Sequence, residues 1–211
     1  MGALLTPPRS RFAAAVHSID DATAARMRGR SWREHPRCPP LSALARIEAS
    51  HVTMDGGVAT GEVVVADEVT APVVTLLARL FAIGFPIVSM RLIDDHDADD
   101  DRSMDAGNSS AFCFRTIAGT DQLSQHAFGL AFDINPVQNP MVWPGGARFV
   151  PAVAAPYLDR RTVRPGMIVR PGPVTAILDD LGWEWGGDWI KLADLHHLVW
   201  PQARLQRGKS R

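Results

Sequence analysis

The clearest hydrophobic pattern in the chain lies at residues 69–83. Apolar residues recur there at three- and four-residue spacing, which predicts a helix, and Gly84 with a proline two residues later supplies the stop signal. Two segments that resemble strands precede the helix: residues 45–52 alternate weakly, and residues 61–66 are rich in β-branched side chains. The turn signal Asp55-Gly-Gly57 between them predicts a β-hairpin.

Shorter patterns follow the helix. Strands are predicted at residues 86–93, 112–115, 130–134, 183–185 and 195–200, and a second helix at residues 172–181. These elements are grouped and lack the regular alternation of a βαβ fold. We therefore expect the α+β class, in a single domain with a mostly antiparallel central sheet and flanking helices.

An acidic segment interrupts the pattern at residues 94–105. It contains seven aspartates, which raises the alternative of a calcium-binding loop. Such a loop needs the order DxDxDG and a closing glutamate, and both are missing here. The segment is predicted to be a solvated, mobile loop.

Length and composition fit one domain. The chain has 211 residues, of which 46% are hydrophobic, enough to bury one sizeable core, and no shift in composition divides it. Residues 1–40 hold five prolines around a short Ala-rich stretch and are predicted to form an N-terminal arm. Residues 41–202 are assigned to the domain and residues 203–211 to a C-terminal tail.

The charge pattern excludes several kinds of partner. The formal net charge is -1 and the basic residues are scattered, so the sequence lacks the positive patch of a nucleic-acid-binding protein or a polybasic membrane anchor. No transmembrane stretch is recognised, and we expect a monomer. The apolar run at residues 12–16 is also shorter than the roughly 7 to 15 residues of a signal-peptide core.

The chain contains two cysteines, Cys38 and Cys113. A disulfide between them would suit an exported protein. Two buried free thiols are the simpler arrangement for two isolated cysteines, and this is our prediction.

Candidate chemistry is concentrated in two segments. Residues 124–133 read Ser-Gln-His-Ala-Phe-Gly-Leu-Ala-Phe-Asp, and residues 185–197 contain Trp-Gly-Gly-Asp-Trp and then Asp-Leu-His-His. A catalytic zinc site usually takes three protein ligands, drawn from His, Asp and Glu, and keeps one position for water. The two segments supply such a set and leave one acid over as a base.

The first segment is suited to a metal because its neighbours are small. In an extended strand at residues 130–134, Ala131 and Asp133 face the same side, and Gly129 also leaves room there for a metal and a peptide. The turn at Gly129 can fold His126 back toward Asp133. In the second segment, strand parity leaves the choice between the two adjacent histidines open.

The combined pattern, SxHxxGxAxD followed by DxxH, resembles the zinc D-Ala-D-Ala carboxypeptidases and L-alanyl-D-glutamate peptidases, which are the VanY-like cell-wall metallopeptidases. The resemblance covers roughly residues 40 to 200. It extends to Ser103-Met104, to the segment Asn108–Arg115, to Asp133-Ile-Asn-Pro136 and to Asn139-Pro140. The final motif of the family usually reads DxMHF, and this chain has His196 and Leu198 in place of Met and Phe.

The resemblance implies a Hedgehog/DD-peptidase-like fold with one zinc ion per chain, held by His126, Asp133 and His197. It places Asp194 as the base that takes a proton from the attacking water. For Asp194 and His197 to reach one metal, the chain must bend between them, because positions three apart in a regular strand face opposite sides. His196 is then expected beside the site, or partly exposed, and not as a ligand.

The resemblance also implies residues for binding the substrate. Arg115 is the candidate cation for a substrate carboxylate or a developing oxyanion, and an ordinary ion pair with the acidic segment is its alternative role. Ser124 and Asp188 are expected to hold substrate or to support the ligands. Trp189 is the tryptophan expected to line the cleft.

The expected function is hydrolysis of D-amino-acid bonds in peptidoglycan stem peptides, most simply as a D-Ala-D-Ala carboxypeptidase. One alternative is an L-alanyl-D-glutamate endopeptidase of the lysin type. A second is a zinc-containing binding module without catalysis, since the Hedgehog signalling domain shares this fold. The substrate implies a location at the bacterial cell wall or periplasm, although no signal peptide is recognised, and otherwise the cytoplasm.

Overall fold

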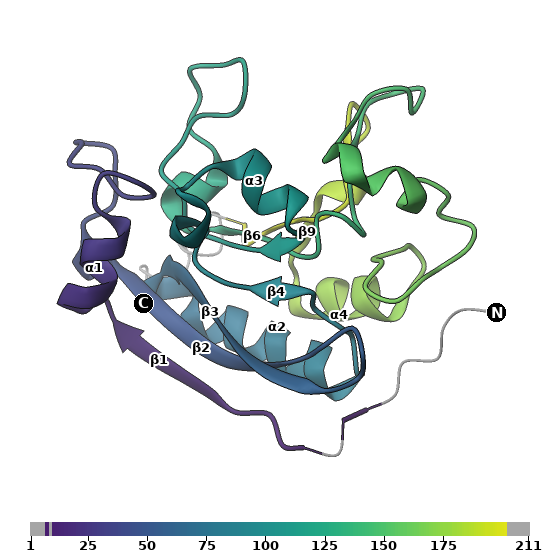
Figure 1. Ribbon diagram of the computed structural model, residues 1–211, viewed down its shortest axis with the longest axis horizontal. Helices are drawn as coiled ribbons and strands as arrows, with labels where there is room; N and C mark the ends of the chain where they lie inside the picture. Colours follow the sequence, from purple (N-terminus) through teal and green to yellow (C-terminus); the bar gives the residue numbers. More distant parts are fainter. Residues whose placement is uncertain (1–6, 9, 202–211) are drawn as a thin grey trace.

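The predicted hairpin forms the core of the first sheet. The computed structural model describes residues 7, 8 and 10–201. In it, β2 (Leu44–Val52) and β3 (Val58–Ala66) pair antiparallel along their whole length, which confirms the hairpin. A third strand, β1 (Ala14–Ser18), pairs antiparallel with the other edge of β2 (Figure 1).

The predicted amphipathic helix is also present, as α2 (Thr70–Ala82), and it packs against this sheet (Figure 1). Its buried side chains are Val73, Leu76, Leu77, Leu80 and Phe81. Full burial of such a side chain contributes about 1.5–3 kcal/mol relative to leaving it exposed, so this helix face anchors the core. The second predicted helix, α4 (Pro173–Leu181), lies beside α2 and extends the same core.

The remaining strands form small sheets that carry the second half of the chain. One sheet has the order β6-β11-β9 and another the order β10-β7-β8, and both are antiparallel. Their bounds are β6 (Ala131–Asp133), β11 (His197–Val199), β9 (Glu184–Trp185), β10 (Ala193–Asp194), β7 (Met141–Val142) and β8 (Phe149–Val150). The α+β class is confirmed, but the antiparallel pairing is divided among several sheets and does not form one central sheet.

Short elements connect these sheets. A parallel pair, β4 (Ser89–Met90) and β5 (Asn108–Ser109), lies next to β3. The 3-10 turns are η1 (Leu41–Ala43), η2 (Asp67–Val69), η3 (Ile93–His96), η4 (Gln125–Phe128), η5 (Ala152–Tyr157) and η6 (Gly186–Asp188). Among the residues that the structure describes, no helix is long and apolar enough to cross a membrane.

The prediction of a solvated loop for the acidic segment is wrong. The segment folds into η3 and the short helix α3 (Asp100–Asp105), and the Asp99 side chain caps this helix by accepting from the Arg102 N–H at 3.0 Å. Asp94 is buried and accepts from both the N–H and the Oγ of Ser31. Burial raises the pKa of Asp94, and these two hydrogen bonds only partly oppose that effect. Asp99 therefore serves as a helix cap and Asp94 as a buried acceptor.

Two predicted strands also differ from the structure. Of residues 86–93, only Ser89 and Met90 pair in a ladder. Residues 112–115 form no strand, because the N–H groups of residues 112, 113 and 114 donate to three separate carbonyls, those of Val64, His126 and Ser31.

The described part of the predicted N-terminal arm packs closely on the domain. In addition to β1 it forms α1 (Asp21–Met27), whose Met27 is fully buried in a second apolar cluster with Cys38 and Phe112. Cys38 and Cys113 are both free and buried, which confirms the prediction of free thiols. Burial raises the pKa of Cys113 to about 12. The predicted tail at residues 203–211 lies outside the described residues.

Candidate metal centre

Three buried side chains from separate elements converge on one point. His126 lies in η4, Asp133 ends β6, and His197 begins β11, where it is the direct cross-strand partner of Asp133. His126 Nε2 lies 3.1 Å from Asp133 Oδ2 and 3.2 Å from His197 Nδ1. His197 Nδ1 lies 2.9 Å from Asp133 Oδ1. The structure thus brings together the three residues that the sequence offered as ligands.

A tight turn carries His126 to this point. The Ser124 Oγ accepts from the His126 N–H at 3.3 Å and so caps the turn. Gly129 ends the turn with a φ of 68°, in the left-handed region where glycine is favoured. A Cβ at Gly129 would lie 2.4 Å from the Ala66 backbone nitrogen, so a side chain there would also push the turn off β3.

The donor atoms fit a tetrahedral zinc ion. The Nδ1 of His126 is 2.6 Å from the Ala111 carbonyl, which can only accept, so this nitrogen carries the proton and Nε2 presents a free lone pair to the cluster. Zinc binds nitrogen and carboxylate oxygen at about 2.0–2.2 Å, which places neighbouring ligand atoms of a tetrahedron roughly 3.3 Å apart. The two histidine nitrogens are 3.2 Å apart, close to this value, and each histidine faces a different oxygen of Asp133, at 3.1 Å and 2.9 Å. His126, Asp133 and His197 could therefore hold a metal ion.

The electrostatic environment keeps the central carboxylate ionised. Burial raises the pKa of Asp133, but the histidines His126 and His196 and the hydrogen bonds to the carboxylate outweigh this effect and hold the pKa well below its ordinary value. A carboxylate must be ionised to bind a metal cation.

Asp194 approaches the cluster from a different sheet. It ends β10, which pairs with β7, whereas His197 begins β11 in the neighbouring sheet. The bend expected between Asp194 and His197 therefore exists, at the two residues that separate these strands. Asp194 itself lies in a short strand. Its Oδ1 is buried and has no hydrogen-bond partner within the described residues, so it can still accept a proton.

His196 is buried and contacts Asp194, so its ring lies beside the site and is not partly exposed. Its Nδ1 donates to the Asn139 carbonyl at 2.7 Å, while its Nε2 is 3.0 Å from Asp194 Oδ1 and 3.9 Å from Asp133 Oδ2. The 3.0 Å contact is close enough for an ion pair but is not aligned as a hydrogen bond. Burial lowers the pKa of His196, yet the carboxylates of Asp194 and Asp133 outweigh it and raise the pKa overall.

Arg115 forms the ion pair that was the alternative to its catalytic role. Its Nη2 lies 2.9 Å from Asp100 Oδ2 at the start of α3, while its Nε is buried without a hydrogen-bond partner within the described residues. Burial lowers the pKa of Arg115, and the charges of Asp100, Asp133 and Asp194 raise it overall. The guanidinium is therefore within the electrostatic field of the cluster and keeps one unused donor.

Asp188 and Trp189, the two candidates from the Trp-Gly-Gly-Asp-Trp segment, differ in whether they contact the candidate ligands. Asp188 is half-exposed and pairs with Arg170, and no contact joins it to the ligands in the part of the chain that the structure describes. Trp189 is 42% exposed and its ring lies 5.4 Å from the His197 ring, so it packs beside one of the candidate ligands. Sequence reasoning assigned no role to Asn139, Asp100 or Gly186. Two adjacent glycines follow Trp185, and this pair was the local sign that the backbone at Gly186 lies close to other atoms.

A comparison with known families agrees with this geometry. Residues 118–200 match the family model described as D-alanyl-D-alanine carboxypeptidase. The matched segment includes the three candidate ligands as well as Asp194. The match confirms the resemblance to the VanY-like peptidases over these residues. No curated protein and no solved structure gives a significant match to the chain.

Proposed function

We propose that the protein is a zinc-dependent D-alanyl-D-alanine carboxypeptidase that acts on peptidoglycan stem peptides. The observation that carries the proposal is the convergence of two histidines and a carboxylate beside a second buried carboxylate, Asp194, whose Oδ1 accepts no hydrogen bond within the described residues. His126, Asp133 and His197 would hold the zinc. When bound, the ion supplies Lewis-acid chemistry, which makes water more acidic and polarises the scissile carbonyl.

Asp194 acts as the general base in this mechanism. Its carboxylate accepts a proton from the attacking water and then returns the proton to the departing amine of D-Ala. His196 lies against the same oxygen and restricts the position of the carboxylate. A base in this role contributes on the order of a hundredfold to ten-thousandfold to the rate.

Arg115 recognises the free carboxylate of the terminal residue. Asp100 occupies Nη2 and fixes the side chain, while the unpaired Nε is available for a substrate oxygen. A planar guanidinium suits a carboxylate, and a fixed cation near the scissile bond favours removal of one residue from the end. Trp189 contributes an apolar wall beside His197.

The assignment also includes the Hedgehog/DD-peptidase-like fold, which the family resemblance implies, and a place of action at the bacterial cell wall or periplasm, which follows from the substrate class.

The decisive experiment offers the zinc-loaded protein a stem pentapeptide that ends in D-Ala-D-Ala and identifies the products by mass spectrometry. We expect release of one D-Ala and little action on an all-L peptide. Amidation of the terminus removes the partner of Arg115 and should slow cleavage by about tenfold or more. Equal rates on free and amidated peptides, or cleavage between L-Ala and D-Glu, would instead assign an endopeptidase.

A further inference from the structure

The turn η6 lies directly against both the proposed base and a proposed ligand. A Cβ at Gly186 would lie 2.6 Å from the carbonyl oxygen and 2.9 Å from the Cβ of Asp194, and 3.3 Å from the Cβ of His197. Gly186 has no left-handed backbone angle that would require glycine, so the constraint is space alone. The position of this turn therefore sets how closely β10 and the start of β11 approach each other.

The residues on either side of the turn contact the same region. Trp189 follows the turn. Its backbone N–H donates to the Gly186 carbonyl at 3.2 Å, and its ring lies against His197. Trp185 precedes the turn, and its indole N–H donates to the carbonyl of Leu195 at 2.9 Å, within the bend between Asp194 and His197. The segment at residues 185–189 thus holds the bend from several sides.

One arginine fixes this segment to the rest of the domain. Arg170 binds Asp179 of α4 through two hydrogen bonds of 2.7 and 2.9 Å. The same guanidinium contacts Asp188 of η6, at 2.8 Å from Nε and 2.9 Å from Nη2, and lies 5.7 Å from the Trp185 ring centroid. We call these three charged residues, Arg170, Asp179 and Asp188, the α4–η6 anchor.

We propose that Arg170 is a positioning residue for the peptidase site. Through the α4–η6 anchor it holds η6 in place, and Gly186 and Trp185 transmit that position to Asp194 and His197. The inference rests on the proposed function. It assigns Asp188 the role of holding η6 through Arg170, in place of direct support for a metal ligand.

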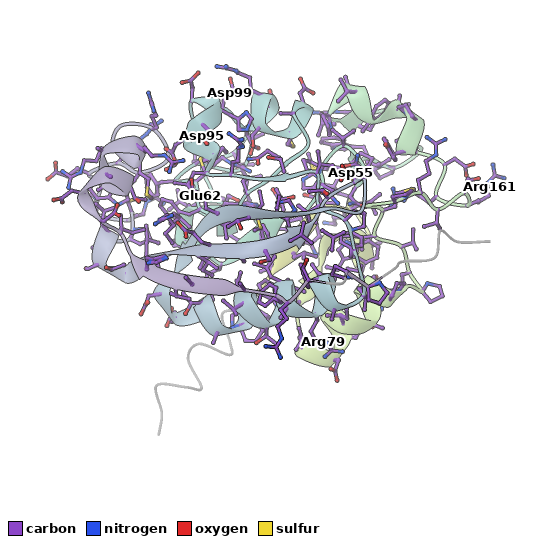
Figure 2. The ribbon with its side chains drawn as sticks, turned by 60° about the horizontal axis from the view of Figure 1, so that its bottom comes forward. Asp55, Glu62, Arg79, Asp95, Asp99 and Arg161 are labelled. Carbon is purple, nitrogen blue, oxygen red and sulfur yellow. The ribbon has the colours of Figure 1, made fainter. Side chains whose placement is uncertain are left out.

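A general effect on stability is a separate question from positioning. The residues of the anchor are partly exposed, so solvent screens their ion pairs, and the melting temperature measures separately what the anchor contributes to folding stability. Loss of the anchor should therefore leave the protein folded and change the site. Arg79 offers a matched control, because it forms an exposed ion pair with Asp180 on the same helix. Figure 2 shows Arg79 on the side of the molecule where α2 lies beside α4, so its loss removes a comparable pair without touching η6.

The test compares Arg170→Gln, Arg170→Lys and Arg79→Gln in the full chain. Three quantities are measured: kcat and KM for D-Ala release, the dissociation constant of zinc by competition with a chromophoric chelator, and the melting temperature. For Arg170→Gln we expect kcat to fall by about threefold to tenfold and zinc binding to weaken by at least about twofold, less than the 10- to 100-fold typical of a residue that contacts a ligand directly. Arg170→Lys should recover part of both losses, and Arg79→Gln should match the wild type.

Gly186→Ala tests the contact itself and should produce larger losses in the same two quantities. If Gly186→Ala does not fold, the comparison of the Arg170 variants with Arg79→Gln still tests the proposal. Arg170→Gln equal to Arg79→Gln in both kcat and zinc binding would overturn the proposal. If the wild type binds zinc but releases no D-Ala, the proposed function fails. The positioning role of Arg170 is then tested by the zinc dissociation constants of the variants alone.

Discussion

Replacement of Asp194 by Asn separates metal binding from catalysis most cleanly. The two side chains have nearly the same shape, so the change removes the negative charge and the ability to accept a proton while leaving the packing intact. Asp194 is buried, and its Oδ1 accepts no hydrogen bond within the described residues, so the main contact that the change weakens is the ion pair with His196. The three candidate ligands lie on other elements and keep their mutual contacts of 2.9–3.2 Å.

The expected magnitude follows from the role of the base. A loss of at least about a hundredfold in kcat corresponds to about 2.7 kcal/mol of lost transition-state stabilisation, at 1.36 kcal/mol per tenfold. Zinc content should remain close to one ion per chain, because Asp194 is not one of the converging donors. KM should change little, since the terminal carboxylate of the substrate is held at a different residue.

The assay measures D-Ala release over a range of stem-peptide concentrations and zinc content by metal analysis, on the same preparation. Asp194→Glu is a useful companion, because it retains the charge but displaces the oxygen. Full activity in Asp194→Asn would refute the assignment of the base. Loss of zinc in that variant would instead place Asp194 among the ligands.

Further predictions concern the other residues of the site and the fold. His197→Ala should lose zinc in metal analysis, whereas His196→Ala should largely keep it, and the opposite result would exchange their roles. Arg115→Ala should lower kcat/KM for the free peptide by about tenfold or more with zinc content unchanged, and unchanged kinetics would return Arg115 to a plain ion pair with the acidic segment. Burial lowers the pKa of His51, so the unfolded chain binds a proton that the folded chain does not. The wild type should therefore lose unfolding free energy faster than His51→Gln as the pH falls below about 6.5, as measured by urea unfolding; parallel losses would contradict this.

The sequence predicted those helices and strands whose formation depends on neighbouring residues. The hairpin at β2 and β3 and the helices α2 and α4 follow from alternation, helical spacing and turn residues, all of which act within a few positions. The sequence also indicated the residues that converge on the candidate site, because the resemblance supplied their long-range relationship.

Features that depend on distant partners could not be predicted in this way. The strand β1 exists because β2 offers it an open edge, and nothing within residues 14–18 specifies that partner. The acidic segment was misread because the burial of Asp94 depends on Ser31, more than sixty positions earlier. The charged contacts of Arg170 likewise join residues from separate elements.

The placement of Asp133 and His197 opposite one another on β6 and β11, with Asp194 on a separate sheet, has an evolutionary consequence. Under the proposed mechanism, the ability to hold the ion and the ability to use it reside on different strand pairs. A single substitution on β10 would then abolish turnover while the ion remained in place. A descendant of such a protein could drift from hydrolysis to simple recognition of wall peptides without rebuilding its core.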